Sequence, residues 1–574
     1  MSVSKKGMLI NMIRMFETHE KRIQKELGGL WKLETLDSEG NISGSYTAVI
    51  PSCWESVIGL EDYRGRAKYS VNISTSSKNL RFVFKGISHT GDIYLDGKHI
   101  GHHYNAYTPF TVPVSGCTEG EHLLEVIADN RFTPDSSLHV PNDYRTYGGI
   151  NRPVALEELG NAYIEYLHVK NTRSDDGWKT QFVAKVCRFE DNRSSYTATA
   201  SLAGKTVDFG NIVFEGSSAI ITASTEFDSV NEWLPETPNL YIAHIKLFEN
   251  GEYIDDLKER IGFRDIKIYG EKILVNGKQV FLKGFNRHED YGTLGSAVPE
   301  NVMNYDLDII ASTGSNFVRT CHYPNDERFL DLCDEKGFFV WEEGHARGLN
   351  EDRMKNPNFK KQSADCIEEM VLNHFNHPSI IIWGILNECA SHTEYGAECY
   401  KLQYDQLKEL DPSRPRTSAT CQHLKDLCYG MEDIISLNIY PRWYTWYGND
   451  YAPLEHYKKI KEYIDTCISS PKPVIISECG AAAIYGYRAF SHVKWSEDRQ
   501  CDVLKELIEE LSSSDEISGI AIWQFADCRI DDDFRDWNSR PKTQNNKGIV
   551  DIYRNPKQGY YTVKDCFTKI KEYK

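Results

Sequence analysis

The 574-residue sequence lacks the signatures of a chain held together by disulfide bonds or by zinc. Its 15 cysteines are odd in number, and no two of them stand in a Cys-x-x-Cys spacing. Several, including Cys321, Cys333, Cys366 and Cys479, fall inside apolar stretches. Buried free cysteines behave as small apolar side chains, whereas disulfide frameworks and zinc sites need regularly spaced or clustered ligands. We therefore expect reduced thiols and no metal site.

The sequence also lacks an excess of basic residues and any long apolar run. Its 66 Lys and Arg residues face 84 Asp and Glu residues, for a net charge of −18, which argues against a nucleic-acid partner. No stretch approaches the roughly 18 consecutive apolar residues of a membrane-spanning helix. Near the N-terminus, Asn11 and Arg14 interrupt a short apolar run that has no signal-peptide cleavage site. We expect a soluble, cytoplasmic protein with no membrane partner.

The composition is rich enough in apolar residues, at 40%, to form several packed cores. A chain of this length should divide into about three domains. Over residues 1–160, short alternating runs such as RFVFKGI and HLLEVIA are separated by turn signals such as the Asp-Gly of LDGKHI, which predicts a β-sandwich. A second strand-rich stretch, residues 161–266, has the length of about 100 residues that suits an immunoglobulin-like sandwich.

From residue 267 to 574 the pattern changes to alternating strands and helices. The candidate strands are FLKGFN, NFVRTCHY, FFVWEEG, IIIWGILNE, RTSAT, IISLNIY, VIISECG and GIAIWQF. Helical patterns such as DERFLDLCDEKG lie between them. Eight strand–helix units in roughly 300 residues predict a (β/α)8, or TIM, barrel. Barrels of this kind place their catalytic groups at the carboxyl ends of the strands.

Two of these candidate strands carry a glutamate at their carboxyl end, Glu388 in the fourth and Glu478 in the seventh. A buried parallel strand reads as a continuous apolar run, so an acid at its end stands out. The two ends face one another across the mouth of a closed barrel. A single strand-end glutamate could equally well form a structural ion pair with Arg or Lys. A pair of carboxyl groups, however, is what cleaves a glycosidic bond, at a separation of about 5–5.5 Å in retaining enzymes.

Longer motifs resemble glycoside hydrolase family 2, and more narrowly its β-glucuronidase branch. YRGRAKYS, IYLDGKHIGHHYNAYTPF and YRTYGGINRPV resemble the family's N-terminal, jelly-roll-like sugar-binding sandwich, and KGFNRHED and FVRTCHYP resemble its first two barrel strands. NHPSIIIWGILNE resembles the acid/base signature, and PVIISECGA resembles the nucleophile signature. The resemblance implies that Glu388 is the acid/base and Glu478 the nucleophile. It also implies that Asn387 binds the sugar 2-hydroxyl.

The segment QNNKGIVDIYRNPK, residues 544–557, bears on which sugar is bound. Members of the β-glucuronidase branch carry an Asn-x-Lys motif before a glycine, and Asn545 and Lys547 match it here. The resemblance implies that both residues bind the C6 carboxylate of the sugar. Lysine supplies a compact positive charge for a carboxylate, and a neutral hexose would leave that charge unmatched. Without the resemblance, Lys547 would be read as an ordinary surface lysine. We expect β-D-glucuronides as substrates.

The resemblance extends to further substrate-binding residues. Asp143 matches an acid of the sandwich domain that reaches into the barrel mouth. Tyr440 is expected to hydrogen-bond the nucleophile, and Trp523 to form the floor of the pocket. The remaining residues are expected to line the pocket or stand at strand ends: His288, His322 and Tyr444. For each of these residues the alternative is a packing role at the barrel rim.

The sequence departs from the family pattern in two places. Cys479 follows the nucleophile where relatives often have tyrosine, so the support of Glu478 is expected to differ. The segment of residues 344–366 is short compared with relatives that carry a long loop over the site. An open mouth is expected to admit bulky or polymeric aglycones.

Other functions stay open at this point. Another exo-acting member of the same family, a β-galactosidase or a β-galacturonidase, would keep both glutamates and differ in pocket contacts. A catalytically silent carbohydrate-binding protein would need neither glutamate, and a metal-dependent hydrolase would need a ligand cluster. The double displacement itself requires no cofactor. Some bacterial relatives carry a flavin mononucleotide away from the active site, and relatives commonly form dimers or tetramers. No motif in the sequence decides either point.

Overall fold

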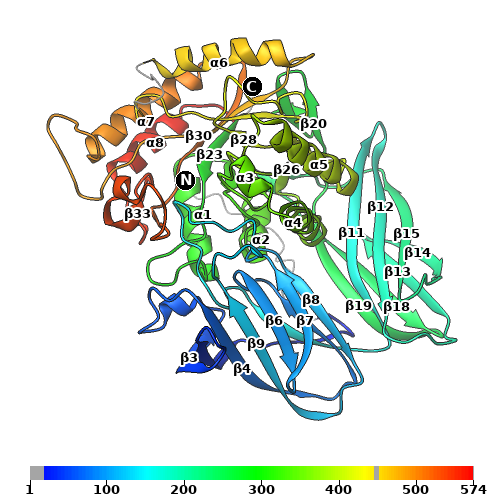
Figure 1. The fold of residues 1–574 in the computed structure, drawn as a ribbon. Helices are drawn as coiled ribbons and strands as arrows, with labels where there is room; N and C mark the ends of the chain where they lie inside the picture. The colour runs from blue at the N-terminus through cyan, green and yellow to red at the C-terminus, as the bar shows by residue number, and fades with distance from the viewer. Residues whose placement is uncertain (1–18, 445–450, 573–574) are drawn as a thin grey trace, which may run out of the picture.

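The computed structural model describes residues 19–444 and 451–572, which form two β-sandwiches and a barrel (Figure 1). These are the three kinds of fold expected from the sequence, and they follow one another in the expected order. The N-terminal run that contains Asn11 and Arg14 lies outside the described residues. Within the described part of the chain, no helix combines the length and the hydropathy needed to cross a membrane.

The N-terminal sandwich, blue in Figure 1, consists of two antiparallel sheets with the strand orders β3-β2-β4-β9-β6-β7 and β1-β10-β5-β8. The strands are β1 (Ile23–Glu26), β2 (Gly29–Leu36), β3 (Ile42–Ile50), β4 (Arg66–Thr75), β5 (Asn79–Phe84), β6 (Thr90–Leu95), β7 (Lys98–Tyr104), β8 (Phe110–Ser115), β9 (Gly120–Asp129) and β10 (Val154–Leu159). The Asp-Gly signal forms the tight β6–β7 turn, in which Asp96 and Gly97 both have positive φ, at 51° and 76°. Such a turn matches the twist of the strands that it joins.

The second sandwich is immunoglobulin-like, with seven main strands in two sheets ordered β11-β12-β15 and β14-β13-β18-β19. These strands are β11 (Ala162–Ser174), β12 (Gly177–Arg188), β13 (Tyr196–Leu202), β14 (Lys205–Asn211), β15 (Ser218–Phe227), β18 (Tyr241–Glu249) and β19 (Glu252–Ile261). Two short paired strands, β16 (Trp233–Leu234) and β17 (Thr237–Pro238), lie between β15 and β18 in the chain, and Trp233 packs against Phe339 of the barrel. Alternating burial along β12 and β13 explains why these segments form the inner face of a sandwich.

The barrel is a closed parallel sheet, because its two terminal pieces belong to one stretch of chain. The order is β27-β26-β25-β24-β23-β31-β30-β29-β28, and β27 and β28 are separated only by Ser418. The bounds are β23 (Leu282–Asn286), β24 (Phe317–Thr320), β25 (Phe339–Glu343), β26 (Ile380–Gly384), β27 (Arg416–Thr417), β28 (Ala419–Thr420), β29 (Ile435–Asn438), β30 (Val474–Cys479) and β31 (Ile517–Ile522). Each of the eight apolar runs predicted from the sequence supplies one barrel position.

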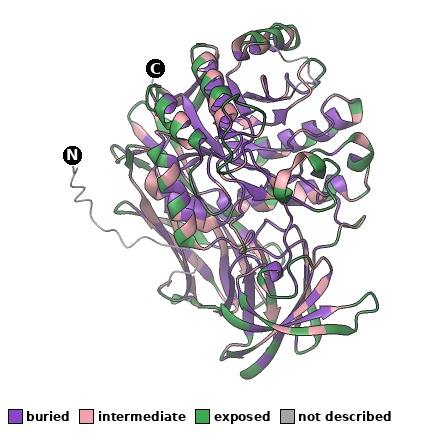
Figure 2. Cartoon of the chain, turned by 90° about the vertical axis from the view of Figure 1, so that its left-hand side faces the viewer, coloured by how far each residue is buried: buried purple, intermediate pink, exposed green. Residues whose placement is uncertain are grey.

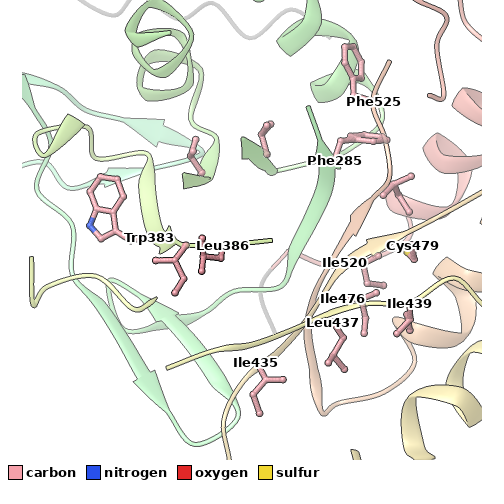
Figure 3. Close-up of a cluster of buried hydrophobic side chains, with 14 of the residues drawn as sticks. Phe285, Trp383, Leu386, Ile435, Leu437, Ile439, Ile476, Cys479, Ile520 and Phe525 are labelled. Atoms are coloured by element: carbon pink, nitrogen blue, oxygen red, sulfur yellow. The ribbon is translucent and has the colours of Figure 1, made fainter. Parts of the chain in front are cut away.

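Helices surround this sheet on its outer side. They are α1 (Glu300–Ser312), α2 (Glu327–Lys336), α4 (Phe359–His374), α5 (Glu394–Leu410), α6 (Pro453–Cys467), α7 (Glu497–Leu511) and α8 (Gln558–Phe567). The short helix α3 (Glu351–Met354) belongs instead to the loop at the carboxyl end of the barrel, between β25 and α4. The barrel strands are buried throughout, whereas the outward faces of the helices are exposed (Figure 2). Figure 3 shows part of the core between strands and helices, where Leu437, Ile476 and Ile520 come from three neighbouring strands.

The two ends of the barrel differ in what covers them. A small sheet of β20 (Ile266–Tyr269), β21 (Lys272–Val275) and β22 (Lys278–Gln279) packs Ile273 and Val275 against Phe317 and Phe339, at the beginnings of β24 and β25. The amino end of the barrel is therefore closed by an apolar core. The carboxyl end is left for polar side chains, which is where the strand-end glutamates were predicted to lie.

Three histidines are buried where the N-terminal sandwich meets the barrel. His89 and His139 belong to the sandwich and His345 follows β25, and each is at most 2% exposed. The rings of His89 and His139 stack with a centroid separation of 3.9 Å, and the ring of His345 is tilted by 58° against that of His139 at 4.4 Å. Burial lowers the pKa of all three, to about 3 for His345. The interface between the N-terminal sandwich and the barrel therefore contains histidines that are neutral in the folded protein.

We expect the protein to lose stability as the pH falls below about 6.5, the ordinary pKa of histidine. Below that pH the unfolded chain binds protons that the folded cluster excludes, so each histidine costs about 1.4 kcal/mol per pH unit. Urea unfolding midpoints measured between pH 7.5 and pH 5 test this. The variant His345→Gln should flatten the pH dependence relative to the wild type. Equal slopes in the variant and the wild type would contradict the assignment.

Candidate active site

The carboxyl end of the barrel opens into a cavity of about 710 Å³. Its wall includes both predicted catalytic glutamates, Glu388 and Glu478. Other predicted residues also line it, namely Asp143, Tyr440, Tyr444, Trp523 and Lys547. Residues from the loop after the third barrel strand to the last loop of the barrel, together with one acid from the N-terminal sandwich, thus converge on one site. A cavity of this size accommodates a small ligand.

Glu478 is held by two hydrogen bonds at the end of β30. The Arg319 guanidinium donates to its Oε1 at 3.0 Å, and the Tyr440 hydroxyl donates to its Oε2 at 2.8 Å. Burial, together with the nearby charge of Glu388, raises the pKa of Glu478 to about 7, although Arg319 and Tyr440 act in the opposite direction. The expected bond from Tyr440 is present. An oriented, partly ionised carboxylate in a buried cavity can serve as a nucleophile.

Glu388 lies beyond the strand that was expected to end in it, because β26 ends at Gly384. It has a positive φ of 51°, and its backbone N–H donates to the carbonyl of Ala419 at 2.9 Å. Its carboxylate accepts a hydrogen bond from Asn438 Nδ2 at 3.0 Å and lies 3.6 Å from Arg347. The carboxyl group is therefore presented by a turn above the barrel mouth, where it remains partly accessible to solvent.

Arg319 connects the nucleophile to the neighbouring strand ends. Besides Glu478, its guanidinium donates to Glu343 Oε2 at 2.7 Å and to Asn387 Oδ1 at 2.9 Å. Asn438 also donates to Asn387 Oδ1, at 3.1 Å. Asn387 Oδ1 thus accepts two hydrogen bonds, and the buried Nδ2 of the same side chain has no partner among the described residues. A side chain oriented in this way can donate a hydrogen bond to a sugar hydroxyl.

Glu343 is a third buried carboxyl group beneath the pair. It accepts from Arg319, and its Oε1 lies 2.9 Å from His322 Nδ1. Burial raises the pKa of Glu343 to about 8, against the opposing effect of Arg319. His322 stacks on Trp523 with a centroid separation of 5.1 Å. Because burial and Arg319 lower the pKa of His322, this histidine is neutral, and the Glu343 contact fixes its ring orientation.

Asp143 extends from the N-terminal sandwich to the barrel mouth, as predicted. It forms ion pairs with Arg540 at 3.0 Å and with Arg347 at 3.2 Å. Burial alone would raise its pKa, but these two guanidinium groups hold the pKa of Asp143 well below its usual value. Asp143 Oδ2 also accepts from Asn545 Nδ2 at 3.1 Å. The carboxylate is therefore ionised, and it links the sandwich to two barrel loops.

Lys547 is 3% exposed, with its ammonium group inside the cavity. The ammonium lies 5.2 Å from the ring centroid of Tyr444 and 5.8 Å from that of Tyr440. Burial and the charge of Arg540 lower the pKa of Lys547. Within the described chain no carboxylate oxygen lies within 4.0 Å of the ammonium. A buried cation in an open cavity favours an anionic group on the ligand.

Four of the predicted residues stand behind the cavity wall. Asn387, His322 and Asn545 are buried and contact residues that line the cavity, as described above. His288 packs against Tyr144 and the edge of Trp523, at centroid distances of 4.7 Å and 5.4 Å, and burial lowers its pKa to about 3. Its place is that of a packing residue beneath Trp523, which was the alternative considered for it.

Three arginines of the site were not predicted from the sequence. Arg319 lies on a predicted strand, but nothing in NFVRTCHY distinguishes it from a structural ion-pair residue. Arg347 follows the third strand by four residues, so its position near a strand end was the available signal. Arg540 belongs to the segment between β32 (Cys528–Arg529) and β33 (Gln544–Asn545) and offers no local pattern.

One group of described side chains has the spacing of metal ligands. Asp331 and Asp334 of α2 and His377 each offer an atom within 4.8 Å of the others. Arg260 forms an ion pair with Asp331 and lies 3.8 Å from Asp334, while His377 Nδ1 contacts Asp334 at 2.6 Å. The carboxylates thus already have cationic partners, and the group serves as an ion-pair network between the second sandwich and the barrel.

The fold and the site together define a glycoside hydrolase, and the chain belongs to glycosyl hydrolase family 2. Residues 266–572 match the family's "TIM barrel domain", residues 162–264 match "Glycosyl hydrolases family 2", and residues 54–181 match its "galactose-binding domain-like" region. The family that the motifs resemble is therefore confirmed.

Individual relatives differ in their described substrates. A crystal structure of a β-galacturonidase from Eisenbergiella tayi bound to galacturonate is 46% identical, with a TM-score of 0.93 and coverage of 98% of this chain and all of that one. A β-glucuronidase of Streptococcus agalactiae is 26% identical and matches over 96% of both chains. A putative β-glucuronidase of Formosa agariphila is also 26% identical, and the match spans 62% of that longer protein.

Proposed function

We propose that the protein is a retaining exo-β-uronidase. In this mechanism Glu478 attacks the anomeric carbon while Glu388 protonates the departing oxygen, and water then releases the sugar with Glu388 acting as the base. Glu388 gives a proton to the departing oxygen when the glycosidic bond breaks, and it takes a proton from water when the bond to Glu478 breaks. The surroundings of the two groups support these roles, because Glu478 is held by Arg319 and Tyr440 whereas Glu388 stands at the accessible side of the cavity.

The observation that carries the uronide assignment is the buried ammonium group of Lys547. Asp143 is already shared by Arg347 and Arg540, so it does not neutralise Lys547 as a dedicated partner. The C6 carboxylate of a hexuronide would supply that partner, while Asn545 holds Asp143 from behind the cavity wall. A neutral hexose would leave the cation desolvated and without a counter-charge, which is unfavourable.

We propose β-D-galacturonides as the first substrate and β-D-glucuronides as the second. The two sugars differ in the configuration at C4, the ring carbon next to the one that bears the carboxylate. The 46% identity to a β-galacturonidase over nearly the full chain supports the first. The relatives described as β-glucuronidases, at 26% identity, support the second, which the sequence motifs also favoured. Asp143 and Arg540 line the cavity together with Lys547, and we propose that they contact the C4 hydroxyl.

A panel of four nitrophenyl β-glycosides tests this proposal directly. The galacturonide and the glucuronide should both be hydrolysed with a higher kcat/KM than the galactoside and the glucoside. A preference for either neutral sugar would overturn the uronide assignment. A higher kcat/KM for the glucuronide than for the galacturonide would reverse the order of the two candidates.

We expect Lys547→Ala to lower kcat/KM for the preferred uronide. The corresponding loss of transition-state stabilisation should be about 2–4 kcal/mol, because the change removes one partner of a desolvated charge pair. The matched neutral glycoside should react almost as before, or slightly faster, because a buried cation without a counter-charge is lost. Lys542→Ala is a suitable control, since Lys542 is exposed and lies five residues away. Equal losses on both substrates would mean that Lys547 supports the barrel rather than recognising charge.

A further inference from the structure

A buried ion pair lies directly behind the segment that carries Lys547. Lys557 and Asp527 are 0% and 2% exposed, and the Lys557 ammonium lies 2.7 Å from Asp527 Oδ1. Neither side chain lines the cavity. The ammonium also donates to the carbonyls of Ala483 at 2.7 Å and Asn546 at 3.1 Å. All three donors of the ammonium are thus used, which is the full capacity of a lysine.

The pair acts on the two peptide groups that flank Lys547. Lys557 binds the carbonyl of Asn546, which belongs to the peptide before Lys547. Asp527 Oδ1 accepts from the N–H of Gly548 at 2.9 Å, which belongs to the peptide after it. Because each peptide is planar, fixing both groups fixes φ and ψ of the residue between them. The direction in which the Lys547 side chain leaves the backbone is thereby set.

Other contacts support the same segment from behind. The backbone N–H of Gln524 donates to the carbonyl of Lys547 at 3.0 Å, and the Gln524 side chain donates to the carbonyl of Asn545 at 3.1 Å. Gly548 approaches Asp527 so closely that an added Cβ would lie 2.2 Å from the Asp527 nitrogen. The segment therefore sits against Asp527 with no space for adjustment, so a change in the ion pair would be transmitted to it.

We propose that Lys557 and Asp527 are positioning residues of the carboxylate-binding part of the site. They hold the backbone of residues 546–548 so that the Lys547 ammonium faces the sugar carboxylate. This inference rests on the proposed uronidase function. Recognition of the sugar carboxylate thus depends on a second, fully buried cation, Lys557, which never contacts the substrate.

The variant Lys557→Met tests the proposal, because it keeps the length of the side chain and removes its charge and donors. A displacement of about 1 Å can cost on the order of 100-fold in rate. We therefore expect kcat/KM for the preferred uronide to fall about 10- to 100-fold, mainly through KM. The neutral glycoside should stay within about twofold of the wild-type value, the range expected for independent sites.

A double-mutant cycle with Lys547→Ala separates positioning from general support. If Lys557 acts through Lys547, adding Lys557→Met to Lys547→Ala should change kcat/KM for the uronide by no more than about twofold. An equal loss on uronide and neutral glycoside, or a full additional loss in the Lys547→Ala background, would overturn the proposal. Either result would mean that the ion pair stabilises the barrel and does not position Lys547.

Asp527→Asn provides a second variant in case Lys557→Met fails to fold. It keeps an oxygen for the Gly548 N–H and removes only the charge that holds Lys557. The same selective loss on the uronide, of smaller size, is expected, and a folded variant with unchanged selectivity would overturn the proposal. The wild-type selectivity measured in the same assay tests the uronidase function itself. Without a wild-type preference for uronides both proposals fail, whereas an additive cycle in a selective enzyme overturns only this one.

Discussion

Glu478→Gln is expected to lower kcat on a nitrophenyl uronide by on the order of 10⁴- to 10⁶-fold, the range seen when a covalent nucleophile is removed. Glutamine keeps the shape of the side chain and can still contact Tyr440 and Arg319, so the cavity should persist. It cannot form the glycosyl-enzyme, because an amide is a poor nucleophile at the anomeric carbon. Steady-state kinetics at high enzyme concentration will measure the residual rate.

The control for this variant is Glu342→Gln, which changes a buried glutamate one residue before Glu343 on β25. Glu342 contacts His374 of α4 at 2.8 Å, away from the cavity. It should retain most of the activity provided that it folds, which circular dichroism will show. In the wild-type enzyme, a 2-deoxy-2-fluoro uronosyl fluoride should label a peptide that contains Glu478. Labelling of another residue, or substantial activity of Glu478→Gln, would refute the nucleophile assignment.

Glu388→Gln is expected to act unequally on different leaving groups. General acid catalysis contributes about 10²- to 10⁴-fold, and this contribution should be lost for a methyl or alkyl uronide, whose leaving group needs a proton. A dinitrophenyl uronide leaves as a stable anion, so its first step should be affected much less. Measurement of kcat/KM across a series of leaving-group pKa values will show a steeper dependence in the variant than in the wild type.

Azide offers an independent test of the same residue. In Glu388→Ala the removed side chain leaves space for azide to attack the glycosyl-enzyme without base assistance. Added azide should then restore turnover and give a glycosyl azide with the configuration of the substrate. A variant with equal losses for all leaving groups and no response to azide would show that Glu388 is not the acid/base.

The architecture was predictable because burial leaves a strong trace in the sequence. Strands such as β26 and β30 are buried on both faces, so they read as unbroken apolar runs, and their spacing determined the barrel. The convergence of Glu388 and Glu478 on one cavity was predictable for the same reason, since an acid contrasts with its apolar surroundings. The turn that carries Glu388 was not predictable, because its positive φ depends on the Ala419 carbonyl on the next strand.

Only the resemblance to the family pointed to Asp143, and the arginines of the site could not be read from local patterns. Asp143, Arg347 and Arg540 form one network, yet they are separated by about 200 residues at each step. Each of them alone resembles an ordinary polar residue of a loop. Only the docking of the sandwich onto the barrel brings them together, and that packing depends on tertiary contacts that no single segment specifies. The same holds for Lys557, whose burial follows from its contacts with Asp527 and Ala483.

The position of Asp143 has a consequence for how such a protein can be altered by recombination. The cavity wall combines Asp143 of the N-terminal sandwich with side chains of the barrel. A barrel transferred to a new N-terminal partner would keep its two glutamates but would receive a foreign acid, or none, between Arg347 and Arg540. The two guanidinium groups would then face one another without the anion that separates them. The sandwich and the barrel must therefore be inherited as a matched pair.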